Sequence, residues 1–289
     1  MLKQRVITAL FLLGIVLLAL WAKSPVPFVA LALLMLGAAA WEWARLNGLN
    51  GAGAIAMGLA VTVCCVTAWA SGWLDQALPS WWWAASAAWV LGGAVLLFVS
   101  GVAGWPRIPA VLRWLVGGLM LFTAWLAVAH SRLLGINYLL SALALVWAAD
   151  IAAYFAGRAF GGRLIARKLA PSISPNKSWE GVLGGMLGAL LLAALWIGFD
   201  RHWGAAWGWS DSLYTRLLGV GGTPAVVGGV VALAAMSVVG DLIESMVKRS
   251  AGAKDSSALL PGHGGVLDRV DALLPSLPIA LALITPALV

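Results

Sequence analysis

Long apolar runs, separated by short polar segments, set the pattern of this chain. Nine of these runs are about 17 to 25 residues long, so each can cross a bilayer as a helix. They cover roughly residues 5–22, 26–46, 52–73, 82–103, 110–129, 137–157, 180–199, 223–246 and 271–289. The pattern therefore predicts an all-α, polytopic integral membrane protein with about nine transmembrane helices.

Composition narrows the class further. Of the 289 residues, 62% are hydrophobic and only 10% are charged, which is not typical of a soluble domain of this length. The net charge of +7 would indicate nucleic acid in a soluble protein. In a membrane protein it indicates basic cytoplasmic loops and contacts with anionic lipid headgroups, so we expect no nucleic-acid partner.

The distribution of Lys and Arg predicts the orientation. With a cytoplasmic N-terminus, 14 of the 18 Lys and Arg residues fall on the cytoplasmic side and 4 on the other, as the positive-inside rule requires. This orientation places residues 158–179 and 247–270 on the cytoplasmic side, where a soluble nucleotide is found. The first run lacks a clear small-residue cleavage site, so we interpret it as a retained helix.

The two parts of the chain differ in chemistry. Residues 1–130 predict a scaffold of about five spans, in which Glu42 and Arg45 lie one turn apart and are expected to pair or to reach the interface. Residues 131–289 predict a catalytic region, because Asp150 lies deep in an apolar run and must face protein, water or a cation. The glycines of the seventh run predict close helix packing, and residues 200–222 predict a Trp-rich external loop.

Residues 240–271 hold five of the 11 acidic residues of the chain, together with four basic ones. If the eighth run continues as a helix, Asp241, Glu244, Ser245 and Lys248 share one face. Oxygen-rich clusters of this kind suit Mg²⁺, and interspersed Lys and Arg suit phosphates. The alternative is a charged loop that only anchors the chain, but anchoring needs Lys and Arg without clustered acids.

A second polar stretch, residues 174–181, reads S-P-N-K-S-W-E-G and directly precedes the seventh run. The positive end of a helix and its free N–H groups favour phosphate at such a position. The basic residues before it could instead serve only to contact acidic lipids.

These stretches resemble the phosphatidate cytidylyltransferases, also known as CDP-diacylglycerol synthases. From Ser245 to Asp271 the chain reads S-x-x-K-R-x4-K-D-x5-P-G-H-G-G-x-x-D-R-x-D, which is similar to the signature of that family. Residues 174–181 resemble its S-P-x-K-[ST]-x-E-G element, and Asp150 to Arg158 resembles its D-x3-Y-x2-G-[RK] element. The resemblance covers residues 147–271 in motifs, whereas the N-terminal spans match only in hydropathy.

The resemblance implies transfer of CMP from CTP to phosphatidic acid, which gives CDP-diacylglycerol and pyrophosphate for phospholipid biosynthesis. It implies Mg²⁺, with a second divalent or monovalent cation, and a homodimer among membrane lipids. We expect a bacterial inner membrane and a site that faces the cytoplasm. The predicted metal ligands are Asp241 and Asp268, with Asp271 and Asp150 as further candidates. The predicted catalytic residues are Lys248, Asp241, Asp268, Asp271 and His263. The predicted substrate- and phosphate-binding residues are Ser174, Asn176, Lys177, Ser178, Glu180, Ser245, Arg249, Lys254, Gly264, Gly265 and Arg269.

Two other functions stay open. The first is a secondary transporter or channel in which Asp150 and Asp241 line a pathway, although the repeat halves typical of transporters are not evident. The second is a CTP-dependent kinase or synthase that acts on another lipid, such as an isoprenoid lipid phosphate. Pyrophosphate release from CTP with different lipids separates these functions.

Overall fold

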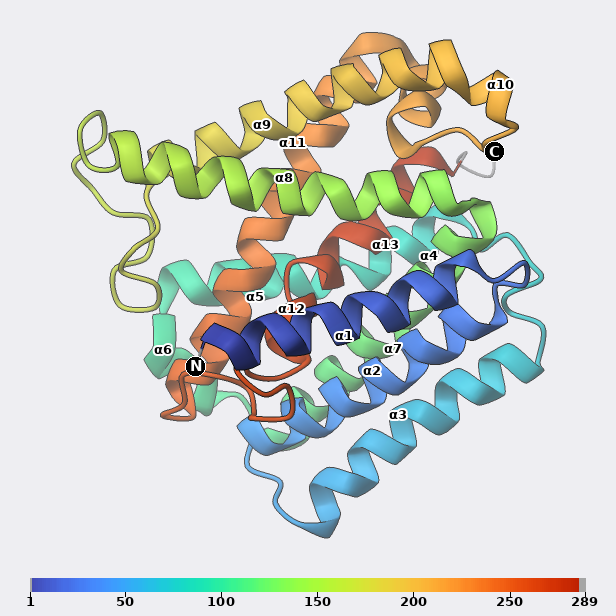
Figure 1. The fold of residues 1–289 in the computed structure, drawn as a ribbon. Coiled ribbons are helices and arrows are strands. Elements are labelled where there is room, and N and C mark those ends of the chain that lie inside the picture. Colours follow the sequence, from blue (N-terminus) through green and yellow to red (C-terminus); the bar gives the residue numbers. More distant parts are fainter. Residues whose placement is uncertain (1, 286–289) are drawn as a thin grey trace.

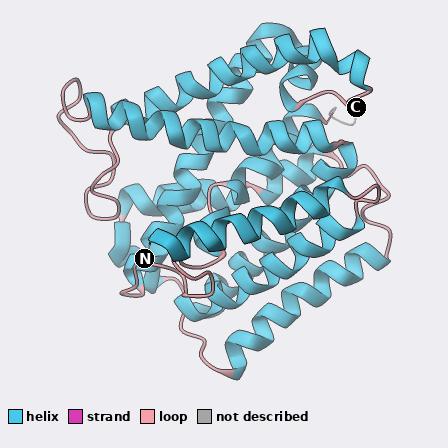
Figure 2. Cartoon of the chain, in the orientation of Figure 1, coloured by secondary structure: helices cyan, strands magenta, loops and turns pink. Residues whose placement is uncertain are grey.

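The computed structural model describes residues 2–285, without the side chains of residues 2–5, 86 and 205. Within this part the chain forms helices and loops, and it forms no strand (Figure 2). The long helices are α1 (Leu2–Trp21), α2 (Val26–Leu46), α3 (Ala52–Ala70), α5 (Ala88–Val99), α7 (Ala110–Leu134), α8 (Ile136–Phe160), α9 (Trp179–Phe199), α11 (Leu213–Ser250) and α13 (Leu273–Ile284). The short ones are α4 (Ser80–Ser86), α6 (Gly101–Gly104), η1 (Trp105–Arg107), η2 (Asp200–Gly204), α10 (Ala205–Trp207) and α12 (Leu267–Val270). The predicted all-α class is confirmed.

Seven helices in the described part are long and apolar enough, by length and composition, to cross a membrane. They are α2, α3, α4 with α5, α7, α8, α9 with η2, and α11. The apolar part of α1, Val6–Trp21, is shorter, and α13 has only 12 residues. The polytopic membrane architecture is thus confirmed, whereas the number of nine spans is not. Residues 286–289 of the predicted last span lie outside the described residues.

The prediction of a loop over residues 200–222 is wrong except for residues 208–212, because η2 and α10 cover residues 200–207 and α11 covers the rest. α11 begins at Leu213, where the hydroxyl of Ser212 accepts a hydrogen bond from the N–H of Thr215 at 3.2 Å and caps the helix. Leu213, Tyr214 and Leu217 are buried, so this turn belongs to the core. The bend comes later, at Gly221 and Gly222, where φ of Gly222 is +66°. Pro224 follows, and it cannot donate a backbone hydrogen bond to the preceding turn.

α11 passes through the middle of the bundle and packs against α13, α9, α8 and α5 (Figure 1). α8 and α9 lie side by side, and the glycines of α9 explain their close approach. A Cβ at Gly185 would lie 2.8 Å from the carbonyl oxygen of Ala149, and a Cβ at Gly184 would collide with Ala156. The predicted small-residue packing of the seventh run is therefore confirmed.

Two loops and the N-terminal end of α1 lie at the same end of the molecule (Figure 1). The first loop, residues 161–178, joins α8 to α9, and the second, residues 251–266, joins α11 to α12. The first loop contacts the last turn of α11, from which the second loop starts, since Nε of Arg249 donates to the carbonyl oxygen of Ile173 at 3.5 Å. The sequence predicts that these segments share one side, and the fold brings them to one end. We refer to this end as the loop end.

Candidate functional site

Two segments far apart in the sequence meet in one ion pair at the loop end. Lys177, just before α9, places its Nζ 2.6 Å from Oδ2 of Asp241 on α11. The hydroxyl of Ser245, one turn further along α11, donates to Oδ1 of Asp241 at 3.3 Å. The side chains of Lys177 and Asp241 are 27% and 33% exposed, so a solute can reach both. The two motifs found in the sequence thus share one accessible site.

A more deeply buried ion cluster lies further along α11. Nζ of Lys248 is 2.5 Å from Oε2 of Glu244 and 2.5 Å from Oδ1 of Asp268. α11 continues to Ser250, so Asp241, Glu244 and Lys248 share one helix face as predicted. One ammonium group faces two carboxylates here. One ammonium group cannot satisfy all four carboxyl oxygens, so burying this cluster requires further hydrogen-bond donors.

Asp268 receives those further donors from the second loop. Its Oδ2 accepts hydrogen bonds from the N–H of Ser256 at 2.9 Å, the hydroxyl of Ser256 at 2.9 Å and the N–H of Gly265 at 2.8 Å. Burial raises the pKa of Asp268, but the hydrogen bonds from Lys248 and the two amides outweigh burial and hold that pKa below its ordinary value. Asp268 is therefore an ionised acceptor that organises residues 256–265.

Asp271 is the acid that the fold places against Asp241. Gly240 makes this approach possible, because a Cβ there would lie 2.7 Å from the carbonyl oxygen of Asp271 and 2.9 Å from Cγ of Pro275. Burial, and then the negative charge of Asp241, raise the pKa of Asp271 well above the ordinary carboxyl range. Asp241 and Asp271 thus place like charges near each other at this point. Asp150 is exposed on α8.

Among residues 2–285, no three His, Cys, Asp or Glu side chains lie in a geometry that could hold a metal ion. The donor set at Asp241 and Asp271 nonetheless fits a hard divalent cation. Mg²⁺ is usually held by one or two carboxylates, with waters and substrate phosphates at its other positions. A cation would also relieve the repulsion that raises the pKa of Asp271. The individual metal-ligand roles of Asp241, Asp268, Asp271 and Asp150 stay predictions.

The loop before α9 is shaped by two residues that the sequence predicts to bind substrate. The hydroxyl of Ser178 caps α9 by accepting from the N–H of Gly181 at 3.1 Å. Glu180 is buried, and its Oε1 accepts from the amides of residues 162, 164 and 165 at 2.9–3.1 Å. Both side chains are therefore engaged in holding the first loop, and Lys177 is the residue of this motif that faces the acids.

The other predicted site residues lie in the two loops and on the adjoining ends of α11 and α12. Arg249, Lys254, Arg269 and Asn176 are exposed, whereas Ser174 is half-buried. Nδ1 of His263 is buried and has no hydrogen-bond partner among the described residues. At Gly264, φ is +84° and a Cβ would lie 2.8 Å from Oδ2 of Asp268. Loop packing alone thus accounts for a glycine at this position.

Glu42 is the residue whose role the sequence misses. The predicted pairing with Arg45 or escape to the interface is wrong, since the Glu42 side chain is fully buried. It accepts hydrogen bonds from four groups of residues 256–267, and Arg45 lies instead 4.7 Å from the ring of Trp41. An acid within an apolar run is a signal, but its partners lie more than 200 residues away and only the fold reveals them.

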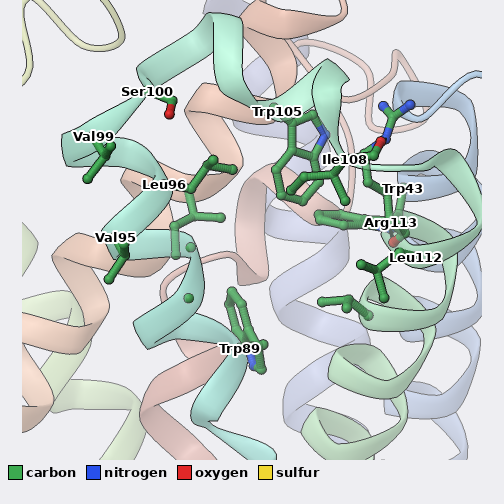
Figure 3. A pocket seen from close by; sticks show the side chains of 14 residues that line it. Trp43, Trp89, Val95, Leu96, Val99, Ser100, Trp105, Ile108, Leu112 and Arg113 are labelled. Carbon is green, nitrogen blue, oxygen red and sulfur yellow. Dashed lines mark hydrogen bonds between the residues drawn. The ribbon is translucent and has the colours of Figure 1, made fainter.

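An apolar cavity of about 400 Å³ lies on the other side of α11 from these acids. It is formed by α5, η1, α7 and α11, and Trp89, Leu96, Trp105 and Leu112 line it (Figure 3). Ile243 is the residue of α11 that lines it, and it lies about 150° around the helix from the face of Asp241 and Lys248. The cavity is therefore separate from the carboxylate site.

Comparison with known proteins identifies the family of this chain. The model of the cytidylyltransferase family matches residues 3–286. A phosphatidate cytidylyltransferase of Pseudomonas aeruginosa is 41% identical over 296 residues, which cover 99% of this chain and 98% of that protein. One from Haemophilus influenzae is 37% identical over 308 residues and covers 96% of each chain. One from Brucella suis is 44% identical over 142 residues, 48% of this chain and 43% of that protein.

Proposed function

This chain belongs to the cytidylyltransferase family, and from this membership we propose that it transfers CMP from CTP to phosphatidic acid, forming CDP-diacylglycerol and pyrophosphate. The observation that carries the proposal is the match along nearly the whole chain to two phosphatidate cytidylyltransferases. The ion pair between Lys177 and Asp241 supports it, because the pair joins the two motifs that resemble that family.

The chemistry requires two phosphate anions to meet. An oxygen of the lipid phosphate attacks the α-phosphorus of CTP in line, the bond from that phosphorus to the bridging oxygen breaks, and pyrophosphate leaves. The attacking phosphate is already anionic, so no side chain has to remove a proton. Catalysis then consists of charge neutralisation and alignment, which Lys177 and Lys248 can supply to the phosphates.

We assign a Mg²⁺ ion to Asp241 and Asp271, with Asp150 and Asp268 as further candidates. When bound, such an ion neutralises phosphate charge and polarises the phosphoryl oxygens. Lys177 contacts Asp241 directly, so it is placed to bind a phosphate that approaches these acids. A second cation, divalent or monovalent, and a homodimer remain part of the proposal.

We further propose that the loop end faces the cytoplasm of a bacterial inner membrane. The supporting observations are the 14 to 4 asymmetry of Lys and Arg and the bacterial origin of the similar proteins. Ser172→Cys, in the exposed part of the first loop, tests it in a chain without Cys64 and Cys65. A membrane-impermeant maleimide should label it only after cells are permeabilised, and labelling of intact cells would contradict the orientation.

The activity is tested with the purified protein in detergent micelles that contain phosphatidic acid. With CTP and Mg²⁺ we expect pyrophosphate and CDP-diacylglycerol in equal amounts, and neither product after chelation. A faster reaction with an isoprenoid lipid phosphate would make the assigned lipid wrong. No pyrophosphate with any lipid phosphate would contradict nucleotidyl transfer and favour the transporter.

A further inference from the structure

Glu42 on α2 binds the second loop through both of its carboxylate oxygens. Oε1 accepts from the hydroxyl of Ser257 at 2.5 Å and the N–H of Val266 at 2.9 Å. Oε2 accepts from the hydroxyl of Ser256 at 3.0 Å and the N–H of Leu267 at 2.6 Å. The side chain is fully buried, so these four donors replace water entirely. One carboxylate from the predicted scaffold thus fixes both ends of residues 256–267.

Ser256 connects this carboxylate to Asp268. Its hydroxyl oxygen lies 3.0 Å from Oε2 of Glu42 and 2.9 Å from Oδ2 of Asp268. A hydroxyl has one proton, so it donates to one of these acids at a time. Gly265 completes the contact, because a Cβ there would collide with both the Ser256 hydroxyl and the Glu42 carboxylate. Glu42 is therefore connected through Ser256 to Asp268, the carboxylate that pairs with Lys248.

We propose that Glu42 is a positioning residue for the reaction, acting through residues 256–267 on Asp268 and Lys248. The inference rests on the proposed function of the same site. The loop contains Gly262 and Gly264 at positive φ, so its own backbone preferences leave it flexible. The hydrogen bonds to Glu42 hold the loop in one conformation, which the loop's own residues do not do. Small displacements of groups that align two phosphates are expected to cost rate, even where the fold survives.

The competing explanation is that Glu42 only stabilises the bundle, and Asp200 provides the matched control. Asp200 accepts from Nδ2 of Asn137 at 2.9 Å, the hydroxyl of Thr215 at 2.6 Å and the N–H of Ser212 at 3.2 Å. It thus holds helix ends together by a similar number of hydrogen bonds. η2, which begins at Asp200, lies at the opposite end of the molecule from the two loops (Figure 1).

The test compares Glu42→Gln, Glu42→Asp and Asp200→Asn in the full chain in detergent. Three properties are measured: the melting temperature, hydrogen exchange of the amides of Val266 and Leu267, and kcat and KM for CTP and phosphatidic acid. For Glu42→Gln we expect faster exchange and a loss of about a hundredfold in kcat. Glu42→Asp should restore part of that loss, because it keeps the charge. Asp200→Asn should lower the melting temperature without changing exchange in the loop or kcat.

Three outcomes would overturn the proposal. These are parental kcat in Glu42→Gln, unchanged exchange at Val266 and Leu267, or parallel loss of kcat in Glu42→Gln and Asp200→Asn. If Glu42→Gln does not fold, Ser257→Ala is used instead, because it removes one of the donors to Glu42. We expect a smaller loss of kcat and faster hydrogen exchange at Val266 and Leu267. If neither change is seen in Ser257→Ala, the proposal is also overturned. An inactive parent chain would contradict the proposed function instead, and loop exchange would still decide whether Glu42 holds the loop.

Discussion

The two ends of the bundle use carboxylates in different ways. At the far end, Asp200 is bound by neutral donors from Asn137, Ser212 and Thr215, and no described cation pairs with it. At the loop end, Asp241 pairs with Lys177 and Asp268 pairs with Lys248, and both acids lie among other acids. The three ion pairs found within residues 2–285 all lie there. Glu42 and Glu180 at the loop end are also held by neutral donors. The acids that pair with lysines, Asp241 and Asp268, are therefore what distinguishes this end and indicates a ligand.

Asp241→Asn should give the largest loss of activity. Together with Asp200→Asn it should show most clearly that the acids at the two ends have different roles. We expect a loss of kcat of about a thousandfold, because the substitution removes the accessible charge at the centre of the site. The melting temperature should change little, since a partly exposed ion pair contributes little stability. Asp200→Asn should show the reverse pattern. Steady-state assays and thermal unfolding of both variants check this, and an active Asp241→Asn enzyme would remove Asp241 from the metal ligands.

Asp268→Asn should combine both effects. It removes the buried partner of Lys248 and an acceptor of three loop hydrogen bonds, so we expect a loss of about 3–5 kcal/mol in the free energy of unfolding. Activity should fall as well. Denaturant unfolding in mixed micelles measures the stability. A variant as stable as the parent would show that the Lys248 cluster is not what holds the loop.

Lys177→Ala should lower kcat/KM by about 10- to 100-fold, which corresponds to the loss of one charge-assisted hydrogen bond to phosphate. Lys168→Ala is the matched control, because Lys168 lies in the same loop and donates only to the carbonyl oxygen of Pro175 at 2.9 Å. Rates measured over a range of CTP and lipid concentrations distinguish the two lysines. Equal losses in both variants would indicate general attraction of anions by the loop.

Mg²⁺ should stabilise the parent against heat, whereas Asp241→Asn and Asp271→Asn should respond weakly. A ligand at a hundred times its dissociation constant adds about 2.7 kcal/mol, which is a rise of several degrees for a chain of this size. Thermal unfolding with and without Mg²⁺, in the absence of nucleotide, measures the shift. Asp200→Asn should respond like the parent. A full shift in Asp271→Asn would exclude Asp271 as a ligand.

Ser245→Ala should give the smallest effect. Its hydroxyl donates to the Asp241 carboxylate at 3.3 Å, which is a long and therefore weak hydrogen bond. We expect kcat/KM to fall by about two- to tenfold. Ser250→Ala, which removes a hydroxyl that donates only to the carbonyl oxygen of Val247, is the control on the same helix. A loss as large as that of Lys177→Ala would mean that Ser245 contacts substrate directly.

Seven of the predicted spans correspond to helices that are long and apolar enough to cross a membrane, because apolar length identifies them, whereas the count of nine is not confirmed. The eighth run also predicts the shared face of Asp241 and Lys248, because helix periodicity fixes it. The start of α11 at Leu213 could not be predicted, because tertiary burial of Tyr214 and Leu217 stabilises a turn in a Trp- and Gly-rich segment. The position of Asp271 beside Asp241 depends on how a short turn packs on α11. The hydrophobic periodicity of the sequence does not predict that packing.

Gly240 has a consequence for the distance between acids on separate segments. The backbone of Asp271 and the ring of Pro275 pack so closely against the Cα of Gly240 that a side chain would not fit between them. An added methyl group would push Asp271 outward without altering any charge. The missing side chain of Gly240 thus determines how closely the backbone of Asp271 can approach α11, one residue before Asp241.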